Sequence, residues 1–393
     1  MFWKLVPPVM ILTTWLTFPN YANGFHTPKM MVWMMGSFLI GTASLWNPPT
    51  RRCYSNKWLW FGIVYVCVLF SWKVIWPQIA ISHIREQPVP QPWNFYAIYP
   101  TLIFIGSMLA IDSMVRHTEN NSRWELVAKW VCLVGGSVAL YGWLQYFGLD
   151  QWQPLNGRNL VANTYPITAP ITVFGNPMVT ATFLSICSPL CLIFNQFRYK
   201  LLFCFIAGLV LAMSTHPAVG VIGVFVGVLV FCYLRKHWVT MFSICAASIL
   251  FGLALLHYMS FAEFIRDGGR IAACKELIAA WRGLAPWTGL GIGSLVQAGV
   301  GGFKFVPLHN DYIQLLGEAG LIGFVLGVCA VGSLIVRAAR APKTRLLSGW
   351  LASLSAYAVS MLVSFPMHFG PGIMLGCLIW AAIASLSGVS ENA

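Results

Sequence analysis

Residues 217–234 read PAVGVIGVFVGVLVFCYL, a stretch with no charged side chain. A helix of this length reaches most of the way across the ~30 Å apolar core of a bilayer, because each residue adds about 1.5 Å. In such a helix the backbone N–H and C=O groups bond to one another, which lipid surroundings require. The stretch therefore predicts a membrane-spanning helix, and similar stretches recur along the chain.

Twelve apolar stretches in all predict an all-α polytopic membrane protein, with residues 1–393 forming a single transmembrane domain. Charged residues make up 9% of the 393 residues and hydrophobic residues 58%, and the mean hydropathy is +0.72. So few charges cannot cover a water-facing surface, so a soluble enzyme, a nucleic-acid-binding protein and a disordered chain are all excluded. The predicted spans are 5–19, 29–46, 58–76, 96–115, 126–147, 169–194, 201–214, 217–234, 239–256, 309–336, 346–365 and 371–388.

Basic residues predict how these spans are oriented. If the N-terminus is cytoplasmic, short inner loops hold fifteen of the 24 Lys and Arg residues, which satisfies the positive-inside rule and places both termini in the cytoplasm. The net charge of +13 is then a topological signal and implies no anionic partner. The longest break, 257–308 between the ninth and tenth spans, becomes a periplasmic loop.

Within that loop, residues 270–282 have apolar side chains at helical spacing and predict a helix lying along the membrane interface. Arg270 lies on the same side of this helix as the apolar residues. Its side chain therefore either anchors the helix at the lipid headgroups or points into the protein. The following Gly289-x-Gly291-x-Gly293 lacks the surroundings of a nucleotide-binding loop, and a tight re-entrant turn is the favoured interpretation.

The most informative element is His309-Asn310-Asp311-Tyr312 at the start of the tenth span. A helix would put Asp311, Gln314 and Glu318 on one face. Glu318 would lie about two turns deep, where it needs a partner or a proton. His309 would fall at the positive end of the helix dipole, which favours a neutral ring able to accept a proton. A structural histidine is the alternative.

This element and several others, in the same order, resemble the O-antigen ligase and polymerase superfamily over residues 140–385. The resemblance rests on the His309 element with Glu318-x-Gly320-x-x-Gly323, and on Gln145-Tyr146-Phe147-Gly148-Leu149, Phe174-Gly175-Asn176-Pro177, Gly269-Arg270, Pro286 with the alternating glycines, and Phe365-Pro366-x-His368. Two features differ from the family. Met178 follows Asn176-Pro177 where members often have asparagine, and His216 stands where many have arginine.

The resemblance implies a metal-independent glycosyltransferase of the bacterial inner membrane that acts in lipopolysaccharide biosynthesis without a cofactor. It would move an undecaprenyl-diphosphate-linked glycan to lipid A–core or another glycan acceptor at the periplasmic face. Membrane lipid would surround the protein. Because the outer face lacks a paired-carboxylate metal site, fixed cations must meet the charge of the leaving group. The expected roles are general base for His309, donor binding for Arg158, Arg270, Arg282 and His216, and support for Asn310, Asp311, Tyr312, Glu318, Asn176 and His368.

Three other functions remain open from the sequence. A polymerase would extend the glycan chain, and a protein O-oligosaccharyltransferase would transfer the glycan to protein. A transporter or flippase for the lipid-linked glycan would belong to a different class, which tends to have paired intramembrane charges and repeated halves.

Overall fold

The computed structural model describes residues 2–16, 27–43, 61, 64–65, 67, 93–118, 121–150, 170, 172–213, 218–243, 245–246, 275, 278, 286–289, 310–364 and 366–388. Every regular element in these ranges is helical, so the all-α prediction is confirmed for the described residues. Helical elements cover most of the described residues of the predicted spans, with an interruption at Gly175-Asn176 in the span 169–194. Twelve crossings and cytoplasmic termini stay predictions, and nearly all of the loop at 257–308 lies outside the described residues.

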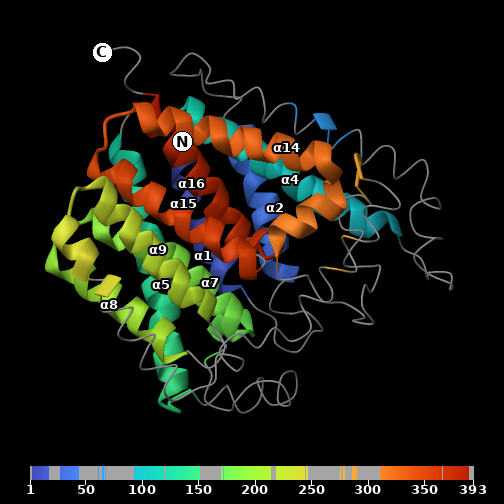
Figure 1. Ribbon diagram of the computed structural model, residues 1–393. Coiled ribbons are helices and arrows are strands. Elements are labelled where there is room, and N and C mark those ends of the chain that lie inside the picture. The colour runs from blue at the N-terminus through green and yellow to red at the C-terminus, as the bar shows by residue number, and fades with distance from the viewer. Residues whose placement is uncertain are drawn as a thin grey trace.

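The helices form a bundle around α16 (Gly370–Ser387), which packs against α4 (Trp93–Arg116) and α15 (Arg345–Val363) (Figure 1). One group of neighbours comes from the N-terminal part of the chain, α1 (Val6–Trp15) and α2 (Thr27–Ala43). A second group comprises α5 (Asn121–Tyr146), α7 (Pro177–Cys187), the 3-10 helix η3 (Ser188–Ile193), α8 (Phe197–Ala212) and α9 (Ala218–Leu234). α14 (Asp311–Arg340) packs against α15 and α16.

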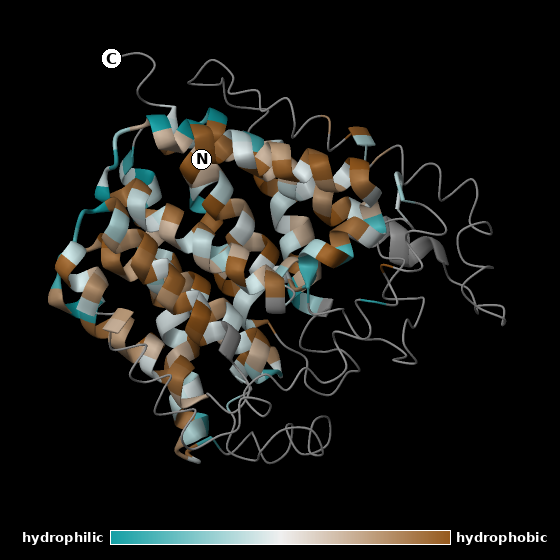
Figure 2. Ribbon diagram, viewed as in Figure 1, coloured by the Kyte–Doolittle hydropathy of each residue, from teal (hydrophilic) through white to brown (hydrophobic). Residues whose placement is uncertain are grey.

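Among the described residues, three helices are long and apolar enough to cross a membrane: α5, α14 and α16. Their surroundings differ, because 83% of the apolar window of α16 is buried in the protein, against 22% of that of α14. The exposed side chains of α14 before its last turn are nevertheless apolar, as Figure 2 shows along the helix, and they are Leu321, Ile322, Val325, Val328, Val331, Ile335 and Val336. Exposed apolar surface of this extent is typical of a helix that faces lipid.

Small residues let the helices approach closely. In α9, Gly223 lies against Ser185 and Gly227 lies against Pro189 and the carbonyl of Ala352, where an added Cβ would be 2.6 Å from the proline ring. Lipid tails are as apolar as side chains, so close backbone packing replaces the hydrophobic effect as the force between membrane helices. The glycines of the stretch at 217–234 therefore join α9 to α7, η3 and α15.

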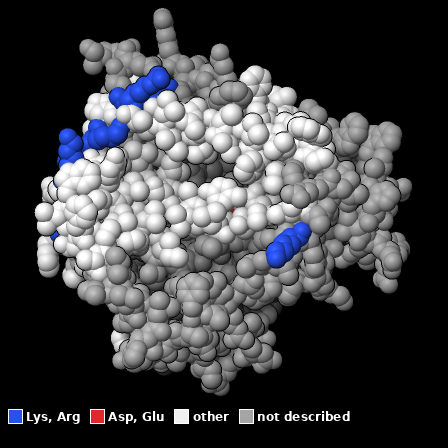
Figure 3. All heavy atoms as spheres, in the orientation of Figure 1, with Lys and Arg blue, Asp and Glu red and all other residues white. Residues whose placement is uncertain are grey.

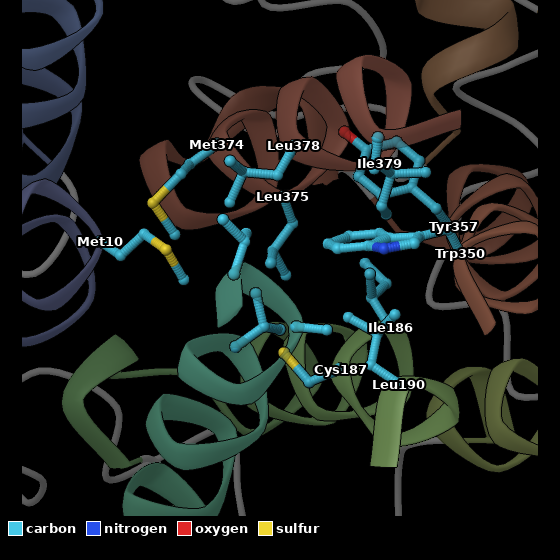
Figure 4. Packing of buried hydrophobic residues seen from close by; sticks show 14 of the residues in the cluster. Met10, Ile186, Cys187, Leu190, Trp350, Tyr357, Met374, Leu375, Leu378 and Ile379 are labelled. Carbon is cyan, nitrogen blue, oxygen red and sulfur yellow. The ribbon is translucent and has the colours of Figure 1, made fainter. Parts of the chain in front are cut away.

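The centre of the bundle is filled by side chains from several segments distant in sequence (Figure 4). Trp350 and Tyr357 of α15 lie beside Ile379 of α16, and Ile186 and Leu190 approach from α7 and η3. This interlocking core orients the ends of α15 and α16, and the candidate site lies at one of those ends.

Basic residues gather at the opposite end of the bundle. Arg235 donates to the carbonyl of Lys343 at 2.8 Å, and Arg345 donates to the carbonyl of Leu192 at 2.9 Å. Lys343 bonds to carbonyls at the end of α14, Ala339 O at 2.8 Å and Ala341 O at 2.9 Å. Figure 3 shows most of the visible Lys and Arg side chains on this face, where α14 ends and α15 begins, with an uncharged region beside them and one further basic side chain beyond it. We refer to this as the basic end, and to the opposite one as the outer end, because the sequence predicts that it faces the periplasm.

α14 is broken at Gly320, which has φ 67° and ψ −175°. Beyond the break, Leu321 N donates to Pro286 O at 3.0 Å and Ile322 N to Trp287 O at 3.2 Å, so a separate segment supplies the acceptors that the helix no longer provides. Gly289, at φ 74°, lies against Gly320, and Tyr65 donates to Ala319 O at 2.7 Å. The predicted re-entrant turn is described only through Gly289, which serves as one side of this backbone junction.

We expect Gly320→Ala to destabilise the protein, because an added Cβ would lie 2.3 Å from Trp287 O and the residue has a left-handed conformation. A backbone with positive φ and ψ near 180° is adopted readily only by glycine and costs another residue about 1–3 kcal/mol. A lower apparent melting temperature in detergent would show the effect. Gly332→Ala is the matched control, because nothing lies within 4 Å of its added Cβ. Equal melting temperatures for the two variants would contradict the close backbone contact between Gly320 and residues 286–289.

Candidate functional site

The structure brings together five of the residues predicted for the site. Asn310, Asp311, Tyr312 and Glu318 lie in the first turns of α14, and His368 lies in the 3-10 helix η5 (Pro366–His368), which links α15 to α16. Asn176 lies elsewhere at the outer end, at the start of α7. His309, Arg158, Arg270, Arg282 and His216 all lie outside the described residues.

Asn310 sets the start of α14. It has an extended conformation, and its Oδ1 accepts from Ile313 N at 3.0 Å, so it caps one of the free N–H groups of the first turn. Its Nδ2 donates to Leu362 O at 3.0 Å, and the hydroxyl of Tyr312 donates to Ala358 O at 3.0 Å. The two side chains therefore fasten the first turn of α14 to the last turns of α15.

Asp311 is a buried carboxylate with 1% of its surface exposed. Its Oδ1 accepts from His368 Nδ1 at 2.8 Å, and its Oδ2 accepts from Met367 N at 2.9 Å. A carboxylate can only accept here, so Nδ1 carries the proton. The side chain of His368 is 27% exposed, and among the described residues no partner bonds to Nε2. The pair thus has a buried acid behind a partly exposed imidazole.

The charges around His368 favour its protonated form. Burial lowers its pKa, but the negative charge of Asp311, the hydrogen bond to Asp311 and the charge of Glu318 together raise it above the ordinary value of 6.5. A raised folded-state pKa means that the protonated pair stabilises the fold fully below the unfolded pKa. That stabilisation is lost as the pH rises through the folded pKa.

Glu318 has a partner on its own helix. Gln314 Nε2 donates to Glu318 Oε1 at 3.0 Å, and both side chains are buried. Asp311, Gln314 and Glu318 therefore share the buried face of α14, and the break at Gly320 follows two residues later. The predicted helical face is present, but the helix does not continue unbroken beneath it.

A second group of polar side chains surrounds the start of α7. Asn176 Oδ1 accepts from Met178 N at 2.8 Å and caps that helix, whose first residue is Pro177. Gln145 joins the end of α5 to this region, because its Oε1 accepts from Thr172 N at 2.8 Å while its Nε2 donates to Asp150 at 3.1 Å. The segments around 145 and 176, which carry part of the resemblance, are thus linked through Thr172.

Lys29 is a residue whose place the sequence did not predict. It is fully buried, and its Nζ donates to Leu16 O at 3.1 Å and Val173 O at 2.8 Å. The ring of Phe174 lies 5.8 Å from the ammonium. A lysine in the first turn of an apolar span was the signal that could have indicated a buried, hydrogen-bonded side chain. The same position is equally typical of a lysine that anchors a helix at the membrane surface.

Compared with models of known protein families and with curated proteins, the sequence gives no match. Among the residues that the structure describes, no group of three or more His, Cys, Asp or Glu is placed to hold a metal ion. The chemistry that the described site offers is therefore that of an imidazole, two carboxylates and hydrogen-bonding amide and hydroxyl groups.

The two bonds of Asn310 can be separated by substitution. Asn310→Asp keeps the oxygen that caps α14 but loses the donor to Leu362 O, whereas Asn310→Ala loses both. We expect Asn310→Ala to lower the free energy of unfolding by about 1 kcal/mol, since this is a typical loss for a helix cap. Asn310→Asp should retain most of that stability. Equal thermal shifts for both variants would show that the cap contributes little.

Proposed function

We propose that this protein transfers a glycan from an undecaprenyl-diphosphate donor to a hydroxyl group of lipid A–core, or of another glycan, at the periplasmic face of a bacterial inner membrane. The supporting observation is the cluster at the start of α14, where Asp311 follows His309-Asn310 and bonds to His368. The cluster lies at the outer end, and the basic end opposite it is the kind of surface that faces the cytoplasm.

The reaction needs three things from the protein. The proton of the acceptor hydroxyl must go to a base, the oxygen must reach the anomeric carbon, and the negative charge of the departing diphosphate must be met. The sequence nominates His309 as the base and Arg158 and Arg270 as diphosphate ligands, since guanidinium binds phosphate oxygens in a bidentate way. Transfer in one displacement would invert the configuration at the anomeric carbon.

The direct test is transfer by the purified full-length protein in detergent, with an undecaprenyl-diphosphate oligosaccharide as donor and lipid A–core as acceptor. We expect His309→Ala to reduce the rate by at least ~10²-fold, the range that general base catalysis contributes. Arg158→Ala and Arg270→Ala should also lose most activity. Product is measured by the mobility shift of lipid A–core on electrophoresis.

His237→Ala is the control for histidine removal, because His237 is exposed and lies next to Arg235 and Lys236 at the basic end. It should retain wild-type transfer. If His309→Ala were as active as His237→Ala, a chemical role for His309 would be excluded. Transfer that extends the donor glycan while lipid A–core stays unmodified would assign the protein as a polymerase.

A lipid-linked glycan transporter is the second candidate, and the break in α14 is the observation that favours it. Discontinuous helices beside a buried ionisable residue recur at the substrate sites of transporters, and Gly320 breaks α14 two residues after Glu318. Glycan transfer in detergent distinguishes the two functions, because detergent leaves no compartments across which to transport. An inactive protein that moves the lipid-linked glycan across vesicle membranes would be the transporter.

A further inference from the structure

The histidine at 368 has the geometry of a base, and the proposed transfer requires one. Its Nδ1–H donates to a carboxylate that is 1% exposed, at 2.8 Å. The second oxygen of that carboxylate is held by Met367 N at 2.9 Å, so Asp311 cannot rotate without losing a bond. This arrangement leaves the lone pair on Nε2 of the neutral ring, as a buried aspartate does for the histidine of a hydrolase triad.

We propose that His368, held by Asp311, is the catalytic base that accepts the proton of the acceptor hydroxyl. The inference rests on the proposed function. It assigns to His368 the role of base that the sequence alone gives to His309. The acceptor oxygen forms its bond to the anomeric carbon, the bond from that carbon to the diphosphate oxygen breaks, and the hydroxyl proton passes to Nε2. His309, two residues before Asp311 in the sequence, is then left as a ligand of the donor phosphates, and the loss expected in His309→Ala would reflect donor binding in place of proton transfer.

The surroundings of His368 are suited to this role. The titratable side chains described on the elements around it are Asp311, Tyr312 and Glu318 at the start of α14, Tyr357 on α15, Cys377 on α16 and Cys187 on α7, and, farther along, Cys329, Arg337 and Arg340 on α14 and Arg345 at the start of α15. The two carboxylates favour proton uptake by the ring. The nearby cation on α2, Lys29, is directed to the carbonyls of Leu16 and Val173. Proton acceptance is therefore favoured by the two carboxylates of α14 and opposed by the burial of the ring.

Asparagine substitutions test the pair with little change in shape. His368→Asn keeps a donor near the position of Nδ1 but removes the base, so we expect a ~10²- to 10⁴-fold loss of transfer. Asp311→Asn should lose activity to a similar extent, because its amide can donate to Nδ1 and so place the ring proton on Nε2. Glu318→Gln should move the acidic limb of the pH–rate profile to lower pH, since it removes a charge that raises the His368 pKa.

The pH profile separates His368 from His309. Wild-type transfer should rise with pH through the folded pKa of His368, because the neutral ring is the active form. The residual activity of His309→Asn should keep this limb, and that of His368→Asn should lose it. The opposite pattern would return the base role to His309 and overturn the inference, as would wild-type rates in His368→Asn.

A measurement that does not depend on transfer tests the pair itself. Diethyl pyrocarbonate modifies neutral imidazole, so mass spectrometry of the His368 peptide after treatment of the full-length protein reports its protonation. The midpoint should lie above the ordinary 6.5 and fall in Asp311→Asn. An unchanged midpoint would overturn the pairing. A raised midpoint in a wild-type protein that transfers no glycan would overturn the proposed function, and the base role with it, while the pairing itself would stand.

Discussion

The buried carboxylate of Asp311 is the constraint on which the outer end of the bundle depends. A charge that is 1% exposed must be bonded on both oxygens, because leaving a buried charge without its partner costs about 3–5 kcal/mol. Asp311 meets this requirement with His368 and the N–H of Met367, and so ties the start of α14 to η5. Asn310 and Tyr312 add hydrogen bonds to α15. The start of α14, the end of α15 and η5 are therefore held together around one acidic side chain.

The same requirement explains the other polar side chains away from water. Lys29 satisfies carbonyls at the end of α1 and before α7, and Gln145 satisfies an N–H and a carboxylate between α5 and α7. In each case a polar side chain bonds to backbone where a helix starts or stops, which is where backbone groups lack helical partners.

The break at Gly320 shows how an interrupted helix remains satisfied. The two N–H groups beyond the break bond to Pro286 and Trp287, and the approach of Gly289 requires that neither residue at the contact has a side chain. The part of α14 before the break, with Asp311 and Glu318, is thereby set apart from the long apolar part that follows. The candidate site therefore occupies a short helical segment held on both sides, by η5 and α15 at its start and by residues 286–289 at its end.

The sequence by itself determined the class of fold, the approximate bounds of the helices and the residues nominated for the site. Apolar runs of bilayer length can satisfy their backbone only as helices, and Asn176-Pro177 and Asn310-Asp311 signal helix starts locally, so no distant partner was needed to predict them. The resemblance placed Asp311 and His368 in one site but left their relation open. Tertiary structure decided that they bond directly across 57 residues, that Lys29 is buried, and that α14 breaks at Gly320. Each of these depends on a segment far away in the chain, and an apolar pattern specifies that a helix is buried but not which neighbour covers it.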